Sequence, residues 1–294
     1  YCGELSAFED LQPAQDLDGT PFLGVDRELL FGTTKAQYDF NNGYQFNAQF
    51  GLRKQELTTG SDSDHLVGGT DVFPISPFFS FPNTDGNKTF NFTDTDATVD
   101  YSGEVRLSSP VEQRFRWSVG AFAYDFSQDG QGITFANGLS PLQDTQTVTN
   151  KAVFASASYD VTEQLEVSLE ARYQSETKGR TEFGNGPNAT PTYQNEGTFE
   201  DFIPKVIVSY DINEDSSAYA SYAKGVKPGG VNGPIGVATG DEFYDPEESN
   251  GFEIGYKARN GIRFGVSYDH RSNAGLNSMN PGVETLQFRV TVPF

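Results

Sequence analysis

The stretch Leu286-Gln-Phe-Arg-Val-Thr-Val-Pro-Phe294 alternates between apolar and polar side chains along its length. Because successive side chains of a β-strand point to opposite faces, Leu286 and Phe288 share one face while Arg289 lies on the other. An apolar face toward lipid, a polar face toward a lumen and a terminal aromatic residue are typical of the strand that closes an outer-membrane β-barrel. The alternative is a half-buried terminal strand of a soluble β-sandwich.

The composition favours the barrel. The 294 residues include 25 Phe, 14 Tyr and 31 Gly, and no stretch shows the sustained apolar period of about 3.6 residues that indicates a helix. Nothing approaches roughly eighteen consecutive apolar residues, so no transmembrane helix is predicted. A mean hydropathy of −0.51 is compatible with a membrane barrel, because only every second residue of its strands must be apolar.

The chain is strongly acidic, with a formal net charge of −21 at pH 7. Nucleic acid is therefore not an expected partner, because phosphate contacts need clustered Lys and Arg. Many of the acidic residues fall in segments that are predicted to be loops, where they are expected to keep exposed backbone soluble. Cys2 is the only cysteine, so no internal disulfide is expected.

Eleven stretches show the alternation of a strand with one apolar and one polar face. Many exceed about ten residues, which is long for a soluble domain and suits a tilted membrane crossing. Charged residues at alternate positions fit a water-filled lumen and do not fit a dry core. The predicted strands are residues 28–40, 44–57, 96–108, 113–127, 147–160, 164–178, 199–211, 216–226, 247–259, 262–273 and 283–294.

The connections between these strands alternate in length. Short polar turns are predicted at 41–43, 109–113, 161–164, 213–216 and 260–261, and long Gly-, Asn-, Asp- and Pro-rich loops at 57–96, 127–147, 179–197 and 226–245. Outer-membrane barrels have short periplasmic turns and long extracellular loops. The fold class predicted from the sequence is therefore an all-β, antiparallel transmembrane β-barrel, with about twelve strands if it closes, because such barrels use even numbers.

The first residues do not continue this pattern. Residues 1–27 hold Pro13, Pro21 and several acidic residues, so they are predicted to be an irregular N-terminal segment or a poorly defined first strand. Residues 28–294 are predicted to form the barrel. Whether the sheet closes by itself, or needs an additional protein chain, stays open at this point.

Two neighbouring segments resemble the TonB-dependent receptors of the outer membrane. Ser217–Asn232 reads Ser-Ala-Tyr-Ala-Ser-Tyr-Ala-Lys-Gly-Val-Lys-Pro-Gly-Gly-Val-Asn, and Phe243–Lys257 contains Pro-Glu-Glu and Glu-Ile-Gly-Tyr-Lys. In that family an aromatic strand ends in Lys-Gly-aromatic-x-x-Gly-Gly-aromatic-Asn, and the next strand opens with Pro-Glu. Further similar stretches are Gly103–Leu107 and Glu170–Tyr173. The resemblance extends from about residue 28 to the C terminus.

The chain is shorter than the members of this family. The resemblance implies an N-terminal plug domain, a TonB box and roughly twenty-two strands, whereas this sequence has room for about half of the strands. After Lys257, Asn260-Gly261 leads almost directly into the last hairpin. We therefore expect a shortened C-terminal barrel portion without a plug, which engages the TonB system only if a plug is supplied elsewhere.

Candidate ligand-binding residues come from the motif and from the aromatic loop. Lys224 and Lys227 lie where a strand emerges into a loop, and Phe78, Phe79 and Phe81 offer rings on which a ligand can stack. The alternative reading is that the lysines belong to a folding and loop-shaping motif and that the rings pack the loop.

A calcium site is the only cofactor that the sequence suggests. Asp62, Asp64 and Asp85 lie in polar loop segments with oxygen-bearing side chains at alternate positions, as in calcium sites. Acidic loops without a bound ion are the alternative, and no other metal or cofactor is expected.

No catalytic residues are predicted. The two histidines, His65 and His270, lie far apart and no zinc or nucleotide-binding pattern is present. Asp269 precedes His270, but adjacent strand residues point to opposite faces and cannot act together. Small barrels that act as hydrolases remain an alternative of lower weight.

The implied function is uptake of a scarce nutrient, such as a siderophore-iron complex, a cobalamin-like molecule or a glycan, across the outer membrane of a Gram-negative bacterium. Expected partners are outer-membrane lipid and the small-molecule nutrient. One alternative is a plugless small barrel that acts as a passive pore or as a structural surface protein. A weaker alternative is a soluble acidic β-protein that binds carbohydrate.

Overall fold

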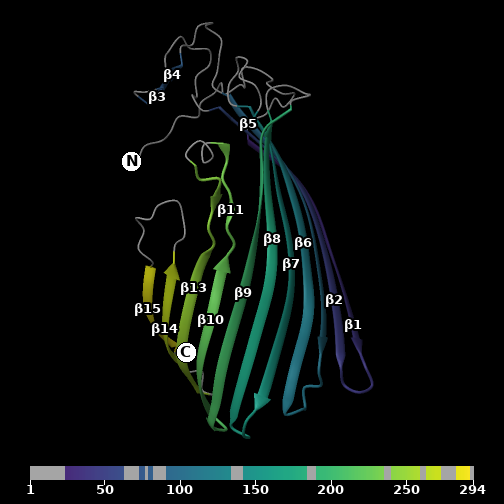
Figure 1. Cartoon of the computed structure of the whole chain (residues 1–294), viewed down its shortest axis with the longest axis vertical. Coiled ribbons are helices and arrows are strands. Elements are labelled where there is room, and N and C mark those ends of the chain that lie inside the picture. The colour runs from purple at the N-terminus through teal and green to yellow at the C-terminus, as the bar shows by residue number, and fades with distance from the viewer. Residues whose placement is uncertain are drawn as a thin grey trace, which may run out of the picture.

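The computed structural model describes residues 24–62, 73–76, 79–81, 91–133, 142–183, 190–234, 240–258, 263–272 and 283–291. Within these ranges one large sheet of eleven antiparallel strands connects each strand to the next in sequence order (Figure 1). No helix among the described residues has the length and apolar character that crossing a membrane requires. The strands of this sheet are β1 (Gly24–Asp39), β2 (Gln45–Asp62), β5 (Asn91–Ser108), β6 (Phe115–Ile133), β7 (Leu142–Asp160), β8 (Leu165–Phe183), β9 (Pro191–Asn213), β10 (Ser216–Lys227), β13 (Glu247–Ala258), β14 (Arg263–Ser272) and β15 (Val283–Thr291).

All eleven predicted strands are confirmed, in the predicted order. Their upper ends were predicted wrongly, because β6 continues to Ile133, β7 begins at Leu142 and β9 begins at Pro191. These extensions are rich in Gly, Gln, Asp and Thr and were predicted to be loops. These extensions lie beyond the part of the sheet that carries an apolar face, so their side chains show no apolar alternation. Backbone hydrogen bonds to the neighbouring strands hold them as strands.

Two short hairpins lie within segments that were predicted to be loops. β3 (Phe73–Ser76) pairs with β4 (Phe79–Phe81), and β11 (Gly230–Val231) pairs with β12 (Phe243–Tyr244). Both belong to the long connections at the upper end of the sheet in Figure 1, whereas the described connections at the lower end are short turns. The predicted alternation of short and long connections is therefore confirmed.

The lower turns are fixed by local hydrogen bonds and by one positive φ angle. In the β1–β2 turn, Gly43 has φ 82° and its amide donates to the carbonyl of Phe40 at 2.9 Å. Glycine adopts this conformation at little cost. In the β7–β8 turn, the hydroxyl of Thr162 accepts from the amides of Gln164 and Leu165 at 3.2 and 3.0 Å. Such local side-chain hydrogen bonds favour turns over continued strands.

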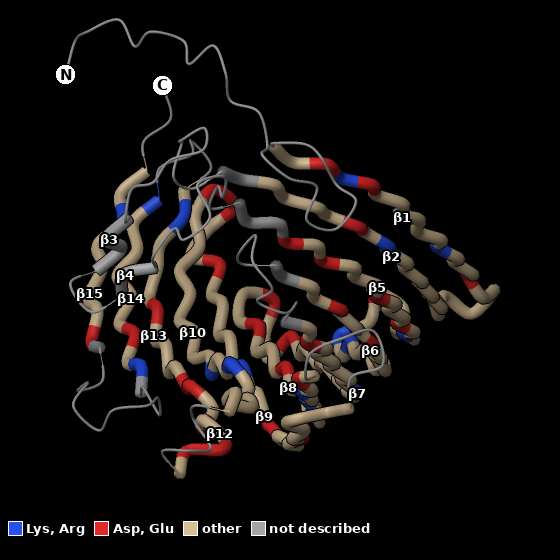
Figure 2. Tube along the Cα trace, turned by 90° about the horizontal axis from the view of Figure 1, so that it is seen from above, with Lys and Arg blue, Asp and Glu red and all other residues tan. Residues whose placement is uncertain are grey.

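The sheet is open. Viewed from above, it forms an arc with β1 and β15 at its two ends (Figure 2). Among the described residues β1 pairs only with β2, and β15 pairs only with β14. The expected number of about twelve strands applied to a closed barrel, and the observed sheet has eleven strands with two free edges.

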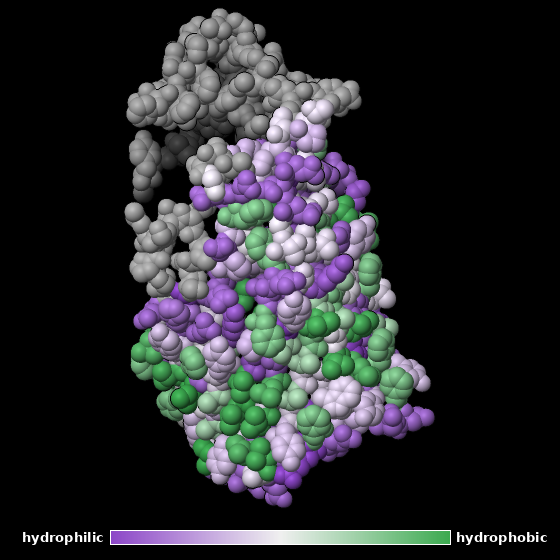
Figure 3. Space-filling model, viewed as in Figure 1, coloured by the Kyte–Doolittle hydropathy of each residue, from purple (hydrophilic) through white to green (hydrophobic). Residues whose placement is uncertain are grey.

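The burial pattern is the reverse of that of a soluble protein. Among the described residues Ala152 and Pro110 are the only buried non-glycine residues with apolar side chains, whereas Phe288 is 74% and Ile254 is 68% exposed. The cross-strand register places Phe252 opposite Tyr222 and Tyr268, and these large residues gather on the outer, convex face. Figure 3 shows a band of hydrophobic residues across the lower half of this face, with hydrophilic residues above and below.

This apolar face has no second sheet against it in the described part of the chain. A soluble sandwich would bury it, because leaving a large apolar side chain in water costs about 1.5–3 kcal/mol. The sheet therefore has the two faces of a transmembrane barrel wall, with the apolar band outside and the polar face inside. Leu286, Phe288 and Val290 lie in this band as predicted from the terminal stretch.

Candidate functional site

The centre of the inner face is a row of arginine and aromatic side chains. The register aligns Arg106, Gly120, Phe154 and Arg172 on four neighbouring strands. The guanidinium of Arg106 lies 5.0 Å from the ring centre of Phe154, and that of Arg172 lies 5.1 Å from the ring centre of Phe122. Gly120 leaves the room in which the Phe154 ring lies, since a Cβ at Gly120 would meet that ring. Each guanidinium therefore makes a cation–π contact with an aromatic ring of the wall.

The next residues up the wall form a network of polar side chains. Asn150, Gln174 and Asp201 are buried to 6% exposure each. Asn150 donates to Glu176 at 2.8 Å, and Gln174 donates to Asp201 at 3.4 Å. Arg172 joins this network by donating to the side-chain oxygen of Asn150 at 3.3 Å. Since buried polar groups need partners, these contacts fix a polar surface that faces the inside of the arc.

The lower end of the inner face is held by one arginine. Arg116 donates to both carboxylate oxygens of Asp160 at 2.6 and 2.7 Å, and to Glu166 at 2.5 Å. Arg114 donates to the backbone carbonyls of Asp160 and Val161. A bidentate guanidinium–carboxylate pair is strong and geometrically specific. This cluster joins β6, β7 and β8 next to their turns, and we assign it a structural role.

The upper end of the inner face is acidic. Asp94 lies in the part of β5 above the apolar band, where burial, together with the charges of Asp96 and Asp144, raises its pKa. Asp96 accepts a hydrogen bond from the side chain of Gln128 at 2.7 Å. In the part of the chain that the structure describes, no three His, Cys, Asp or Glu side chains come together as a group that could hold a metal ion.

The two candidate lysines are ion-paired and lie on opposite faces. Lys224 contacts Glu248 at 2.8 Å, and Lys227 contacts Glu247 at 3.2 Å. Lys224 shares the outer face with Tyr222, whereas Lys227 lies on the inner face. Their contacts link the upper ends of β10 and β13. A role in ligand binding stays a prediction.

The other candidates fall at the edge of the described residues or outside them. Phe79 and Phe81 belong to β4, and Asp62 is the last residue of β2. Phe78, Asp64 and Asp85 lie outside the described residues. The proposed aromatic ligand contacts and the calcium site therefore both remain predictions.

Asp269 and His270 lie on opposite faces of β14, as the alternation predicts. His270 is 3.8 Å from Glu284 on the outer face, whereas Asp269 contacts Arg271 at 3.3 Å on the inner face. The two side chains therefore do not form the acid–histidine pair that a hydrolase of the triad type needs.

Sequence reasoning missed the aromatic side chains of the inner wall. Phe122 and Phe154 were not distinguished in the sequence from the aromatic residues that face outward. The alternation holds the signal, because Phe122 lies one residue from both Ala121 and Ala123 on the apolar face and so must point inward. Their arginine partners come from other strands, and only the register reveals them.

The fold and its two faces define the wall of an outer-membrane-type β-barrel. The family model described as TonB dependent receptor-like, beta-barrel matches residues 5–275. The chain therefore belongs to this family, as the motif at Ser217–Asn232 predicts. No curated protein matches the sequence.

Three solved structures with a similar fold are named as receptors. The ferric yersiniabactin uptake receptor FyuA from Yersinia pestis has a TM-score of 0.63 at 13% identity, covering 84% of this chain and 36% of that receptor. The siderophore receptor PiuA from Acinetobacter baumannii has a TM-score of 0.59 at 14% identity, with coverage of 84% and 40%. The ferripyoverdine receptor of Pseudomonas aeruginosa has a TM-score of 0.54 at 17% identity, with coverage of 83% and 33%.

These similarities establish the fold and not the substrate, since the identities are low. The chain spans 36%, 40% and 33% of the lengths of these three receptors. The solved relatives are named as receptors and none of the three is named as an enzyme. The family model supports an outer-membrane β-barrel fold for this chain.

Proposed function

We propose that this chain forms the wall of an outer-membrane barrel that takes up a scarce nutrient, with a siderophore-iron complex as the first candidate. The observation that supports this proposal is the division of the sheet into an apolar outer face and a charged inner face. Solutes that contain several polar groups pass along a wall of fixed charges and hydrogen-bonding groups more readily than along an apolar wall. The names of the structural relatives favour iron chelates over cobalamin-like molecules and glycans.

The location proposed is the outer membrane of a Gram-negative bacterium, with lipid as the partner of the apolar band. The free edges of β1 and β15 are proposed to pair with further strands, because unpaired backbone groups at membrane depth cost several kcal/mol each. Those strands would come from a partner chain or from another part of a longer polypeptide. Coupling to the TonB system would need a plug domain within the same assembly.

Uptake is tested in cells that carry the chain in their outer membrane, against a strain in which its gene is deleted. Under iron limitation, radioactive iron supplied as a chelate should accumulate faster in the first strain. Collapse of the proton gradient should remove the difference. Arg172→Ala should reduce the uptake, because it removes a guanidinium from the inner wall, whereas Lys151→Ala on the outer face should not.

A passive pore is the second candidate, and the charged inner wall is the observation that favours it. The two functions differ in planar lipid bilayers. Steady conductance by the purified chain, with uptake that survives collapse of the proton gradient, would support the pore. Silence in the bilayer combined with gradient-dependent accumulation would support energised uptake.

A further inference from the structure

The inner face near the lower ends of β13, β14 and β15 carries a recess with a charge opposite to that of the whole chain. The recess has a volume of about 430 Å³, within the range of small-molecule sites. Lys257, Arg263 and Arg289 line it, and Glu253 is the only carboxylate among its lining residues. The chain as a whole has 41 acidic and 20 basic residues, so this local excess of cations is a specific feature of the wall.

The register forces two of these cations together. Lys257 stands directly opposite Arg263 on the neighbouring strand. Like charges in directly opposed positions of an antiparallel pair destabilise it. In the next row, Gly265 stands between Gly255 and Arg289, so the floor beside the arginine carries no side chain. The arrangement concentrates positive charge on this part of the wall at a cost to the stability of the empty sheet.

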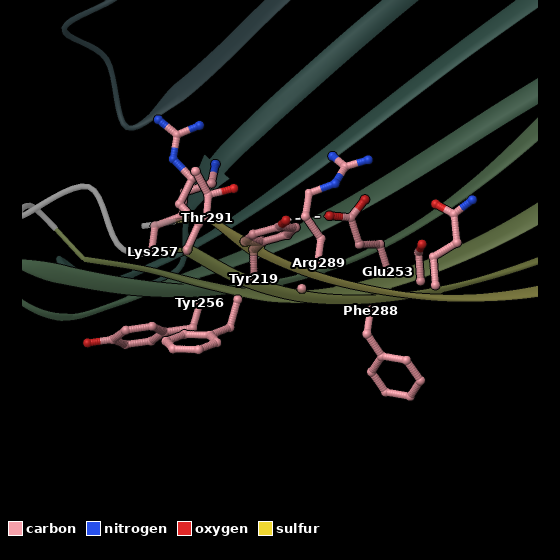
Figure 4. A pocket seen from close by; sticks show the side chains of 12 residues that line it. Tyr219, Glu253, Tyr256, Lys257, Phe288, Arg289 and Thr291 are labelled. Carbon is pink, nitrogen blue, oxygen red and sulfur yellow. Dashed lines mark hydrogen bonds between the residues drawn. The ribbon is translucent and has the colours of Figure 1, made fainter. Parts of the chain in front are cut away.

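The one carboxylate in the recess, Glu253, offsets only one of the three positive charges. Tyr219 donates its hydroxyl hydrogen bond to Glu253, and the Tyr219 ring lies over Gly255. The ammonium of Lys257 lies 4.8 Å from the centre of that ring. Figure 4 shows Tyr219, Glu253 and Arg289 on one side of the sheet, with Phe288 on the other. Among the described residues neither Arg263 nor Arg289 makes an ion pair or a side-chain hydrogen bond.

We propose that this recess binds a small anion that carries several carboxylate or phosphate oxygens. Two guanidiniums present paired N–H donors that match such oxygens, and the ammonium adds a third positive charge. Addition of a strand at the edge of β15 would engage its backbone and leave the side chain of Arg289 facing inward. The site goes beyond the proposed uptake and does not depend on it, because it predicts equilibrium binding at the lower end of the wall.

The test is calorimetric titration of the full chain, folded in detergent, with citrate and with inorganic phosphate at low ionic strength. Citrate should bind, and added salt should weaken the binding because it screens the charges. A preference for citrate identifies a carboxylate ligand, and a preference for phosphate identifies a phosphate ligand. Choline, a cation of similar size, should give no signal. Transport is not measured, so a failure of uptake and a failure of this site are distinguishable.

The variants separate the site from general damage. The double variant Arg263→Gln and Arg289→Gln should bind citrate at least about tenfold more weakly, since it loses two charged hydrogen-bond donors. Arg271→Gln, on the same face of β14 and already paired with Asp269, should bind as the natural chain does. Glu253→Gln should bind more tightly, because it removes the opposing negative charge while keeping an acceptor for Tyr219.

Three outcomes would overturn the proposal. One is that the natural chain, shown to be folded by its heat-sensitive migration on a detergent gel, binds neither anion. Another is that the folded double variant binds citrate with unchanged affinity. The third is that an acidic peptide binds the natural chain but not the double variant, while citrate and phosphate do not bind at all. That result would assign the recess to a protein segment.

Discussion

At the scale of the residue, Gly120 shows how one missing side chain organises the inner wall. We predict that Gly120→Ala destabilises the folded sheet by about 1–3 kcal/mol, because the added methyl group overpacks the site. A Cβ there would meet the Phe154 ring and lie 2.6 Å from the carbonyl oxygen of Val105. Urea unfolding in detergent, followed by the heat-sensitive gel shift, measures the change.

Gly103 supplies the matched control for that substitution. It lies on the neighbouring strand β5, and a Cβ at this position would have nothing within 4 Å. Gly103→Ala should therefore leave the unfolding midpoint unchanged or raise it slightly, because it lowers the conformational freedom of the unfolded chain. Equal effects of the two substitutions would contradict the role assigned to Gly120.

Asp94 gives a prediction about pH at the same scale. Its raised pKa means that the folded protein holds this proton more tightly than the unfolded chain. The stability that it contributes is therefore present at low pH and falls as the pH rises from 3.8 through its raised pKa. Asp94→Asn should remove this fall and stabilise the protein at neutral pH by less than about 1 kcal/mol, because water screens the group.

The measurement is a series of urea unfolding curves across that pH range for both proteins. Only the difference between the two proteins reports on Asp94, because other acidic residues titrate in the same range. Parallel curves for the natural chain and Asp94→Asn would contradict the raised pKa of Asp94, which burial and the charges of Asp96 and Asp144 produce.

At the scale of the element, the outer and inner faces of the paired strands β10 and β13 differ in what they tolerate. Ile254 of β13 is 68% exposed on the outer face, and we predict that Ile254→Arg costs about 2–4 kcal/mol if the residue lies near the middle of the bilayer. Ser221 of β10 faces inward opposite Glu253, so Ser221→Arg should cost much less. Folding yields into lipid vesicles compare the two, and a reversed order would contradict the assignment of the faces.

The strands could be predicted from the sequence because each carries its own evidence. The terminal stretch with Phe288 and Arg289 alternates visibly, and its faces follow from that alternation alone. The upper extensions, such as 128–133 and 142–146, were missed because their residues resemble loop residues and only pairing with a neighbour makes them strands. A strand that is held only by pairing with a neighbouring strand cannot be recognised from its own sequence.

The candidate site was predicted less well for the same reason. The ion pairs of Lys224 and Lys227 involve β13, which the motif itself already suggested as the next strand. The arginine and aromatic row at Phe154 draws on three further strands. The cationic recess combines residues more than thirty positions apart, as Tyr219 and Glu253 are. Such groups exist only once the register is fixed.

At the scale of the whole molecule, the single tryptophan reports on the membrane. Trp117 lies on the outer face near the lower turns, with its ring 5.9 Å from that of Tyr44. Aromatic residues of barrels gather at the interface between lipid and water. We predict that lipids brominated near the headgroup quench its fluorescence more strongly than lipids brominated at the chain end. Quenching by aqueous iodide alone would contradict a lipid-facing wall.

The direction of the two edge strands limits what can complete the cylinder. Strands that alternate in direction leave the first and the eleventh running the same way. If β1 and β15 each pair with an antiparallel neighbour, the two outermost added strands must both run oppositely to β1. The number of added strands is then odd. A second upright copy of this chain would meet both rims through parallel seams, which bacterial barrels avoid. The sheet that completes this arc must therefore begin and end with strands that run oppositely to β1 and β15.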